Sequence, residues 1–298
     1  MPEPLLARFV RRQSWMDPLS DWVQKLVASI WRVLGPPGKP LKNLLHGTVL
    51  LRHPLHPALT DVPIGAWTVG VVADVVAHFT DKVPEATGDI ALAVGLVVAL
   101  GSLITGYTDF ADTYGNERRF GCAHGLLMTV VILIDTVSMG LRWFAGESLH
   151  PLALGFSMSG YALVALGAWY GGHVVLGSGY IVNRQAYLAG PTDWTSVGPA
   201  SAVPGQGMHL VDAGGTQVLL ARLDGRICAL ADVCTHAGGP LHEGTLVNGV
   251  VTCPWHGSRF RLRDGHVIGG PATFDQPQLS VRDTDGQLEV KLAEPPLG

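Results

Sequence analysis

Two short motifs near the end of the 298-residue chain combine cysteine with histidine. The first is C-x-H at Cys234 and His236, and after sixteen residues the second, C-x-x-H, places Cys253 and His256. Thiolate sulfur and imidazole nitrogen both bind metals, and two of each suit a tetrahedral zinc ion. Zinc is therefore the first interpretation. Against it, each motif mixes one cysteine with one histidine, and both motifs lie among glycines between β-prone runs.

The segments CTHAGGPLHEG and CPWHGSRF resemble the cluster-binding motifs of the Rieske iron–sulfur family. The resemblance covers about residues 192–294 and includes GGPA at Gly269–Ala272, which is similar to the proline loop that covers the cluster in that family. It implies that the two cysteines hold one iron of a 2Fe–2S cluster and the two histidines hold the other. Thiolates lower the reduction potential, imidazoles raise it, and the far imidazole nitrogen can couple electron uptake to proton uptake.

Departures from the family pattern narrow the type of Rieske domain. Members in the quinol-oxidising cytochrome complexes carry an extra cysteine in each loop, joined as a disulfide, where this chain has Gly239 and Trp255. They also carry a serine and a tyrosine that donate hydrogen bonds toward sulfur. Here Ser258 is kept, as a residue that tunes the cluster, but Phe260 replaces the tyrosine, so we expect a lower potential. This pattern indicates the ferredoxin type, which carries electrons and performs no bond chemistry.

The elements that position these residues follow from composition. Charged residues make up 15% of the chain and hydrophobic residues 47%, whereas soluble domains usually carry about 25% charged residues. Four segments reach the roughly 20 apolar residues that a membrane-spanning helix needs. They are Leu59–Phe79, Ile90–Tyr107, Cys122–Phe144 and Pro151–Leu176.

We therefore predict a membrane all-α four-helix bundle followed by a C-terminal all-β Rieske-like domain. Residues 1–40 form an amphipathic helix in the membrane interface, in which Asp17 caps the helix and Trp22 and Leu26 lie on the apolar face. A soluble helix packed on the β domain is the alternative. The bundle then takes residues 41–180, a linker 181–191 and the Rieske domain 192–298.

Basic residues indicate the orientation of the bundle. On the side of the membrane that carries both termini, the segments before the β domain have eleven lysines and arginines, and the opposite side has two, Lys82 and Arg142. By the positive-inside rule both termini face the cytoplasm. No cationic segment leads into a short apolar core and a cleavage site, so we predict no signal peptide. The eleven are Arg8, Arg11, Arg12, Lys25, Arg32, Lys39, Lys42, Arg52, Arg118, Arg119 and Arg184.

Polar side chains from every span gather at the cytoplasmic level of the bundle. In RHPLHPALTD, His53 and His56 each precede a proline, which favours extended or polyproline geometry with three residues per turn, so both should point the same way. Such a set could hold a haem by two imidazoles, a non-haem metal or a quinone, and these alternatives stay open. The set is His53, His56, Asp61, Asp109, Asp112, Cys122, His124 and His173.

The segment LHGTVLLRHPLHPALTDVPIGAW resembles the signature of a bacterial four-helix membrane domain of unknown function, over about residues 41–176. That resemblance supports the helix count and implies no activity. Two acids, Asp74 and Asp135, lie inside the bilayer at similar depths in parallel helices. Ionisable residues there are expensive, so a proton path or a protonated pair is one interpretation and packing between helices the other.

These patterns predict an electron-transfer protein of the bacterial inner membrane and no stand-alone catalyst. It passes single electrons between its 2Fe–2S cluster and a quinone or haem b at the cytoplasmic face of the bundle. The expected partners are the lipid bilayer and a redox protein or the quinone pool, with no nucleic acid. Two other functions remain. The helices could be only an anchor for a ferredoxin that supplies a soluble oxygenase or reductase, or the protein could be a redox sensor.

Overall fold

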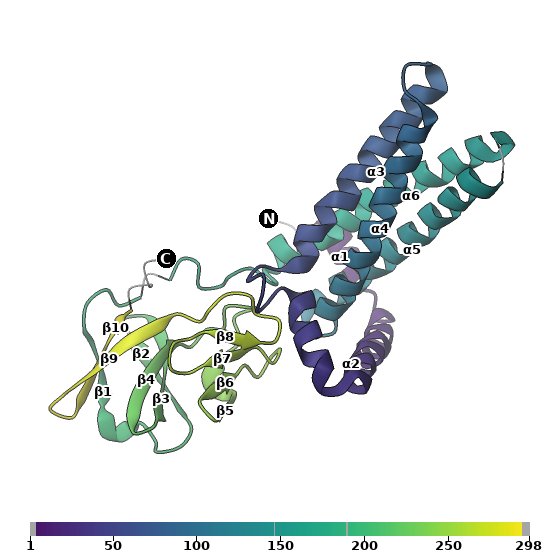
Figure 1. Ribbon diagram of the computed structural model, residues 1–298. Helices are drawn as coiled ribbons and strands as arrows, with labels where there is room; N and C mark the ends of the chain where they lie inside the picture. The colour runs from purple at the N-terminus through teal and green to yellow at the C-terminus, as the bar shows by residue number, and fades with distance from the viewer. Residues whose placement is uncertain (1–3, 146, 189, 294–298) are drawn as a thin grey trace. The chain divides into compact units, whose positions relative to one another are not determined.

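The computed structural model describes residues 4–145, 147–188 and 190–293 and divides the chain into two compact units (Figure 1). The helical unit contains the chain up to Lys39 together with Leu55–Ser178. The β unit contains Pro40–Pro54 together with the chain from Gly179 onward. The segment Pro40–Pro54 thus differs from expectation, because it was assigned to the membrane domain and instead groups with the β-strands.

Four long helices make up most of the helical unit, and each is long and apolar enough to cross a bilayer. They overlap the four predicted spans, which are therefore confirmed as helices. Helix α3 packs closely on α4 and α5 on α6, so the bundle consists of two hairpins (Figure 1). The bounds are α3 (Leu55–Phe79), α4 (Glu85–Phe110), α5 (Asn116–Phe144) and α6 (His150–Gly172), with the turns η1 (Glu147–Leu149) and η2 (His173–Gly177) before and after α6.

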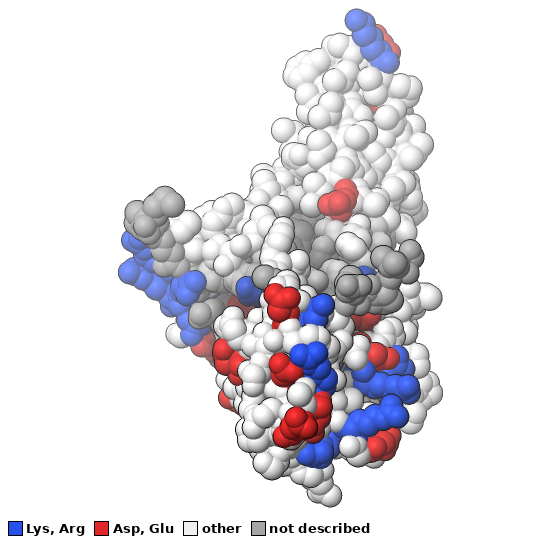
Figure 2. Space-filling model, turned by 90° about the vertical axis from the view of Figure 1, so that its left-hand side faces the viewer, with Lys and Arg blue, Asp and Glu red and all other residues white. Residues whose placement is uncertain are grey.

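Small residues line the interior of the bundle beside a few large ones such as Trp67 and Leu92, while many other large apolar residues of the helices are exposed. Gly95, Ala99 and Ser102 of α4 are buried, as are Gly160 and Gly167 of α6. The face of the bundle seen in Figure 2 carries few charged side chains along its length. Helices in lipid gain nothing by hiding large apolar side chains, but small residues let their backbones approach closely. This arrangement agrees with a membrane-spanning bundle.

Two further helices precede the bundle: α1 (Leu5–Arg11) and α2 (Met16–His46), which is kinked at Gly35, where φ is 57°. One face of α2 is apolar and exposed, as the sequence predicts, with Trp22 61% and Ile30 51% exposed. The Asp17 carboxylate accepts a hydrogen bond of 2.7 Å from Nε of Arg119 in α5. The location of this exposed face in the membrane interface stays a prediction.

Two antiparallel sheets form the β unit, with strand orders β1-β10-β9-β4-β3-β2 and β5-β6-β7-β8 (Figure 1). Short 3-10 turns η3 (Ala200–Ala202) and η4 (Leu241–Glu243) connect strands. The strands are β1 (Thr195–Pro199), β2 (Met208–Ala213), β3 (Thr216–Leu223), β4 (Arg226–Ala231), β5 (Thr245–Val247), β6 (Val250–Thr252), β7 (Arg259–Arg261), β8 (Val267–Gly269), β9 (Gln278–Thr284) and β10 (Gln287–Leu292).

Strand β3 is buried on both faces, which explains its continuous apolar run. Leu219 and Ala221 pack in one core with residues of the smaller sheet and with both motif cysteines. Val218 and Leu220 pack in a second core with β9 and β10. Successive side chains of a strand point to opposite faces, so one strand contributes to both cores. The cysteine loops are therefore packed against a buried core.

Candidate metal centre

Two loops of similar backbone structure carry the motif residues. In the loop after β4, the N–H of Cys234 donates to Gly239 O at 2.9 Å and Gly238 N–H donates back to Cys234 O at 2.9 Å. Between β6 and β7, the N–H of Cys253 donates to Ser258 O at 2.8 Å and Gly257 N–H donates to Cys253 O at 3.1 Å. The two motifs thus present equivalent cysteines from equivalent turns, as paired halves of one site.

The cysteines and the histidines form two separate pairs. The Cys234 thiol hydrogen-bonds to Cys253, and the ring centroids of His236 and His256 lie 4.9 Å apart. Within the described residues, no group of three or more His, Cys, Asp or Glu converges on a single ion. Tetrahedral zinc would need all four ligands around one point. Two pairs set apart fit a two-iron cluster in which each pair holds its own iron, so the residues present fit that group.

Only the loop of Cys253 favours thiolate in the absence of metal, because the hydrogen bond to Cys253 and burial raise the pKa of the Cys234 thiol. A hydrogen bond from the Cys234 thiol lowers the pKa of Cys253 to about 6, against the effect of burial. The backbone N–H groups of Trp255 and His256 also lower the Cys253 pKa. A metal binds the deprotonated sulfur, and donors aimed at that sulfur stabilise its negative charge.

The positions where other Rieske proteins carry a disulfide face each other here. A Cβ built on Gly239 would lie 3.0 Å from Cγ of Trp255 and 2.8 Å from the Cys253 sulfur. Glycine therefore leaves room for both the indole and the sulfur. Ser258 is fully buried and its Oγ accepts a hydrogen bond of 3.1 Å from the Ala272 N–H. The Ser258 hydroxyl proton thus remains available to donate, as expected of a residue that tunes the cluster.

A third loop, between β8 and β9, is hydrogen-bonded to the Cys234 loop. Buried Gln276 donates from Nε2 to Val233 O at 2.7 Å, and its Oε1 accepts from the Thr235 N–H at 3.1 Å. Gly270 has φ of 84°, and a Cβ there would lie 2.6 Å from Gly257 O, so the loop needs glycine at this position. This loop contains the predicted GGPA segment.

Sequence reasoning missed Tyr180, which begins the segment leading into the β unit. Its ring centroid lies 4.7 Å from that of His236 and 6.0 Å from that of His256, both edge-on. The same segment is held by the N–H of Arg184, which donates to Thr235 O at 3.1 Å. No local pattern marks a single tyrosine outside the motifs, so only the folded chain reveals this contact.

The segment Pro40–Pro54 was also missed as part of this site. Thr48 donates from Oγ1 to Gly270 O at 2.6 Å, and the Gly270 N–H donates to Asn43 Oδ1 at 3.3 Å. Arg52 pairs with Asp275. Thr48 and Gly270 are 222 residues apart in the chain, and that separation hid the contact. The N-terminal part of the chain therefore helps hold the loop that covers the cluster site.

Within the bundle, the structure brings together two members of the predicted polar set. The rings of His56 on α3 and His124 on α5 lie next to each other in a T-shaped arrangement, with centroids 6.0 Å apart and planes at 75°. The expectation for His53 was wrong in one respect. Helix α3 begins at Leu55, so His56 is helical and does not share a polyproline turn with His53, which is exposed and belongs to the β unit.

The other members lie elsewhere. Asp61 is exposed, while Asp109 and Cys122 are buried and Asp112 is half-buried. His173 stacks on Trp169, with ring centroids 5.4 Å apart. Across the described part of the chain, these side chains make no cluster of three metal-ligating groups.

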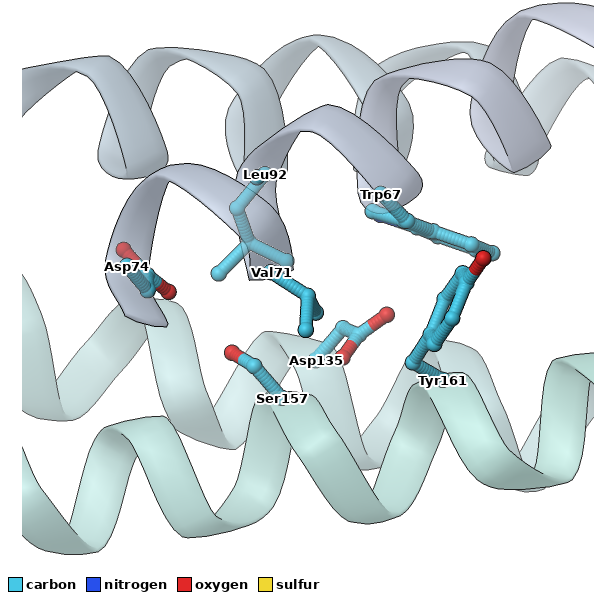
Figure 3. Close-up of a pocket in the computed structure, with 8 residues that line it drawn as sticks. Trp67, Val71, Asp74, Leu92, Asp135, Ser157 and Tyr161 are labelled. Carbon is cyan, nitrogen blue, oxygen red and sulfur yellow. The ribbon is translucent and has the colours of Figure 1, made fainter. Parts of the chain in front are cut away.

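The two intramembrane acids line one small cavity of about 10 Å³, together with Trp67 and Tyr161 (Figure 3). They differ in their partners. Asp74 accepts hydrogen bonds of 3.1 and 2.5 Å from Arg142, which also donates to Asp89 at 2.8 Å. Asp135 is 2% exposed, and its Oδ1 has no hydrogen-bond partner among the described residues. Arg142, which the sequence analysis counts among the basic residues of the side opposite the termini, is the buried partner of Asp74.

Residues 193–280 match the family model described as the Rieske [2Fe-2S] domain, and residues 52–184 match that of a predicted membrane protein, DUF2231. Ferredoxin CarAc of Metapseudomonas resinovorans is 31% identical over 98 residues, which are 33% of this chain and 92% of that ferredoxin.

A second relative is matched over only a small part of its length. Apoptosis-inducing factor 3 of Mus musculus is 31% identical over 87 residues, which are 29% of this chain and only 14% of that protein. Among solved structures, a complex of reduced oxygenase and oxidized ferredoxin in carbazole 1,9a-dioxygenase matches at 27% identity and a TM-score of 0.33. That match covers 35% of this chain and 99% of the matched chain.

Proposed function

Because this chain belongs to the Rieske [2Fe-2S] family and carries a membrane domain of the DUF2231 family, we propose that it is a membrane-anchored carrier of single electrons. The observation that carries the proposal is the separation of two cysteines and two histidines into two pairs on matched loops. A 2Fe–2S cluster bound there would accept and release one electron at a time. Cys234 and Cys253 would hold one iron, and His236 and His256 the other.

The second half of the proposal is a redox site in the bundle at the end that carries His56 and His124. The occupant is a haem or a quinone, and the site exchanges electrons with the cluster. The neighbouring imidazoles support this half, because metal ligation and quinone binding both use imidazole nitrogen. We place the β unit and both termini on the cytoplasmic side of a bacterial inner membrane, on the strength of the basic residues that flank the spans.

Substitution of a cluster ligand tests the first half. In the full-length protein, His256→Ala should abolish the Rieske EPR signal of the dithionite-reduced sample. His266→Ala is the matched control, because this half-exposed histidine of the same unit contacts Asp275 and none of the four ligands. An intact Rieske signal in His256→Ala would overturn the ligand assignment.

A second function is favoured by one observation. Ferredoxin CarAc is covered over 92% of its length, so the β unit has the extent of a complete ferredoxin. The bundle would then be only an anchor, and the cluster would serve a soluble oxygenase or reductase.

Reduction of the cluster by quinol in vesicles separates the two functions. The full-length protein is reconstituted in vesicles with a short-chain quinol, and reduction of the cluster is followed by EPR. With a redox site in the bundle, quinol reduces the cluster, and His56→Ala with His124→Ala slows the reduction at least tenfold. With a plain anchor, quinol does not reduce the cluster, whereas a soluble ferredoxin reductase reduces wild type and variant equally.

A further inference from the structure

The neighbouring histidines of the bundle have the geometry of two ligands on one metal. A metal–nitrogen bond is about 2.0 Å and a ring nitrogen lies about 1.1 Å from its ring centre, so two trans imidazoles have centroids roughly 6.2 Å apart. His56 and His124 have centroids 6.0 Å apart. They come from α3 and α5, which both pack against α4 and α6 and therefore lie diagonally in the bundle. Cofactor sites of helix bundles are built in this way, from side chains on facing helices.

Hydrogen bonds fix both rings in the tautomer that leaves Nε2 unprotonated. Nδ1 of His56 lies 2.9 Å from Ser102 O, and Nδ1 of His124 lies 2.8 Å from Gly167 O. A carbonyl oxygen only accepts, so each Nδ1 carries the proton and donates it. Each Nε2 is then left with a free lone pair. Metal-ligating histidines almost always donate their other ring N–H to a carbonyl or carboxylate, which holds the ring and raises its basicity.

Each ring also rests on a glycine of the helix beside it. A Cβ on Gly106 of α4 would lie 2.7 Å from Cε1 of His56. A Cβ on Gly171 of α6 would lie 2.9 Å from Cε1 of His124. Any other residue at these two positions would displace a ring. Each imidazole is therefore positioned in the same way, by a hydrogen bond to a backbone carbonyl and by close packing on a glycine.

The ligand count selects haem. Throughout the described residues, no third His, Cys, Asp or Glu completes a site with this pair, so a bare ion would have only two protein ligands. Haem iron already has four porphyrin nitrogens and needs only axial ligands from the protein. We propose that His56 and His124 are the two axial ligands of a b-type haem bound in the bundle. This inference rests on the proposed function, whose bundle site it assigns to haem. Ferric haem iron would take one electron from the reduced cluster, or ferrous iron return one to the oxidised cluster, with no bond made or broken.

The full-length protein tests this directly. It is expressed with 5-aminolaevulinate, purified in detergent, and measured as a dithionite-reduced minus air-oxidised spectrum, with a pyridine haemochrome assay for haem content. We expect one haem b per chain and the sharp α-band of a low-spin haem. His56→Ala and His124→Ala should each lose that band. His78→Ala, at the other end of α3, is the matched control and should keep it.

Two further measurements distinguish loss of haem from misfolding of a variant and from failure of the proposed function. His124→Met should retain haem with a raised potential, because methionine is also an axial ligand, and this variant replaces any alanine variant that does not fold. The Rieske EPR signal is recorded in each sample. Its loss from wild type while the α-band persists would overturn the proposed function and leave the haem inference standing. A wild type that binds no haem, even on titration with haemin, would overturn the inference, as would quinone extracted in its place.

Discussion

Histidine occurs in pairs in two regions of this molecule, and the two pairs are built differently. His236 and His256 stand on loops of one small domain, each two or three residues from a cysteine on a matched turn. His56 and His124 stand on separate helices, share no ligand-spacing motif, and are oriented by carbonyls and glycines of two further helices. A sequence motif is enough to predict the ligands where the backbone of one loop sets their geometry. Where four helices set it, only their packing reveals the pair.

The largest expected effect is loss of the cluster from the β unit without loss of haem from the bundle. Cys253→Ser removes a buried thiolate ligand, so the cluster should be lost completely. Because the bundle uses no residue of that loop, its haem should remain. Iron and haem content of the same preparation, together with EPR, would measure this. Loss of both cofactors would show that the two regions do not assemble independently.

The next effect concerns the stability of the bundle. Arg142→Gln leaves the Asp74 carboxylate without its ion-pair partner, although the side chains of both residues are less than a tenth exposed. Removing one member of a buried pair typically costs about 3–5 kcal/mol. Thermal unfolding in detergent should therefore begin at a clearly lower temperature, while the Rieske EPR signal of the folded sample is unchanged. Arg142→Leu combined with Asp74→Leu should recover most of the loss. A double variant no more stable than Arg142→Gln would contradict the pairing.

A glycine substitution sharpens the description of the bundle pair. Gly106→Ala places a methyl group 2.7 Å from the His56 ring, and overpacking of this kind costs about 1–3 kcal/mol. We expect haem affinity to fall by roughly tenfold or more, measured by haemin titration. Gly101→Ala in the same helix is the control, because its methyl group would find its nearest side-chain atom at 3.9 Å. Equal affinities in the two variants would mean that the glycine does not position the ring.

A hydrogen-bond substitution tests the tuning of the cluster. Ser258→Ala removes the buried hydroxyl, and a hydrogen bond to charged sulfur is worth about 1.5–3 kcal/mol. The potential should therefore fall, on the order of 60–130 mV for one electron. Phe260→Tyr, at the position of the missing donor, should raise it. Redox titration followed by EPR measures both, and an unchanged potential in Ser258→Ala would remove this serine from the tuning residues.

The smallest effect tests the segment Pro40–Pro54. Thr48→Val removes the hydrogen bond to Gly270 O, which is worth about 1 kcal/mol. Heating the full-length protein should release the cluster at a temperature a few degrees lower, while the bundle unfolds as before. Thr245→Val on the exposed end of β5 is the control. Identical cluster loss in wild type and Thr48→Val would show that this segment does not stabilise the loop.

Local patterns predicted much of this molecule. The four spans follow from long apolar runs, since a bilayer demands helices of a minimum length. The cluster ligands follow from two motifs, because each loop is only a few residues long and its turn sets the ligand positions. The departures from the pattern of the quinol-oxidising complexes, at Gly239, Trp255 and Phe260, could also be identified directly from the amino-acid sequence. The haem and quinone alternatives for the bundle could not be separated, because composition gathers histidines at one level without saying which of them lie next to each other.

By itself, the amino-acid sequence determined the two-part organisation and the number of apolar helices and predicted the four cluster ligands, all of which depend on residues close together in the chain. Tertiary structure alone decided that His56 meets His124 and not His53, that Arg142 neutralises Asp74, and that Tyr180 and Thr48 belong to the Rieske unit. These contacts join residues tens to hundreds of positions apart. Their geometry is set by helix and sheet packing, which leaves no spacing in the sequence to recognise.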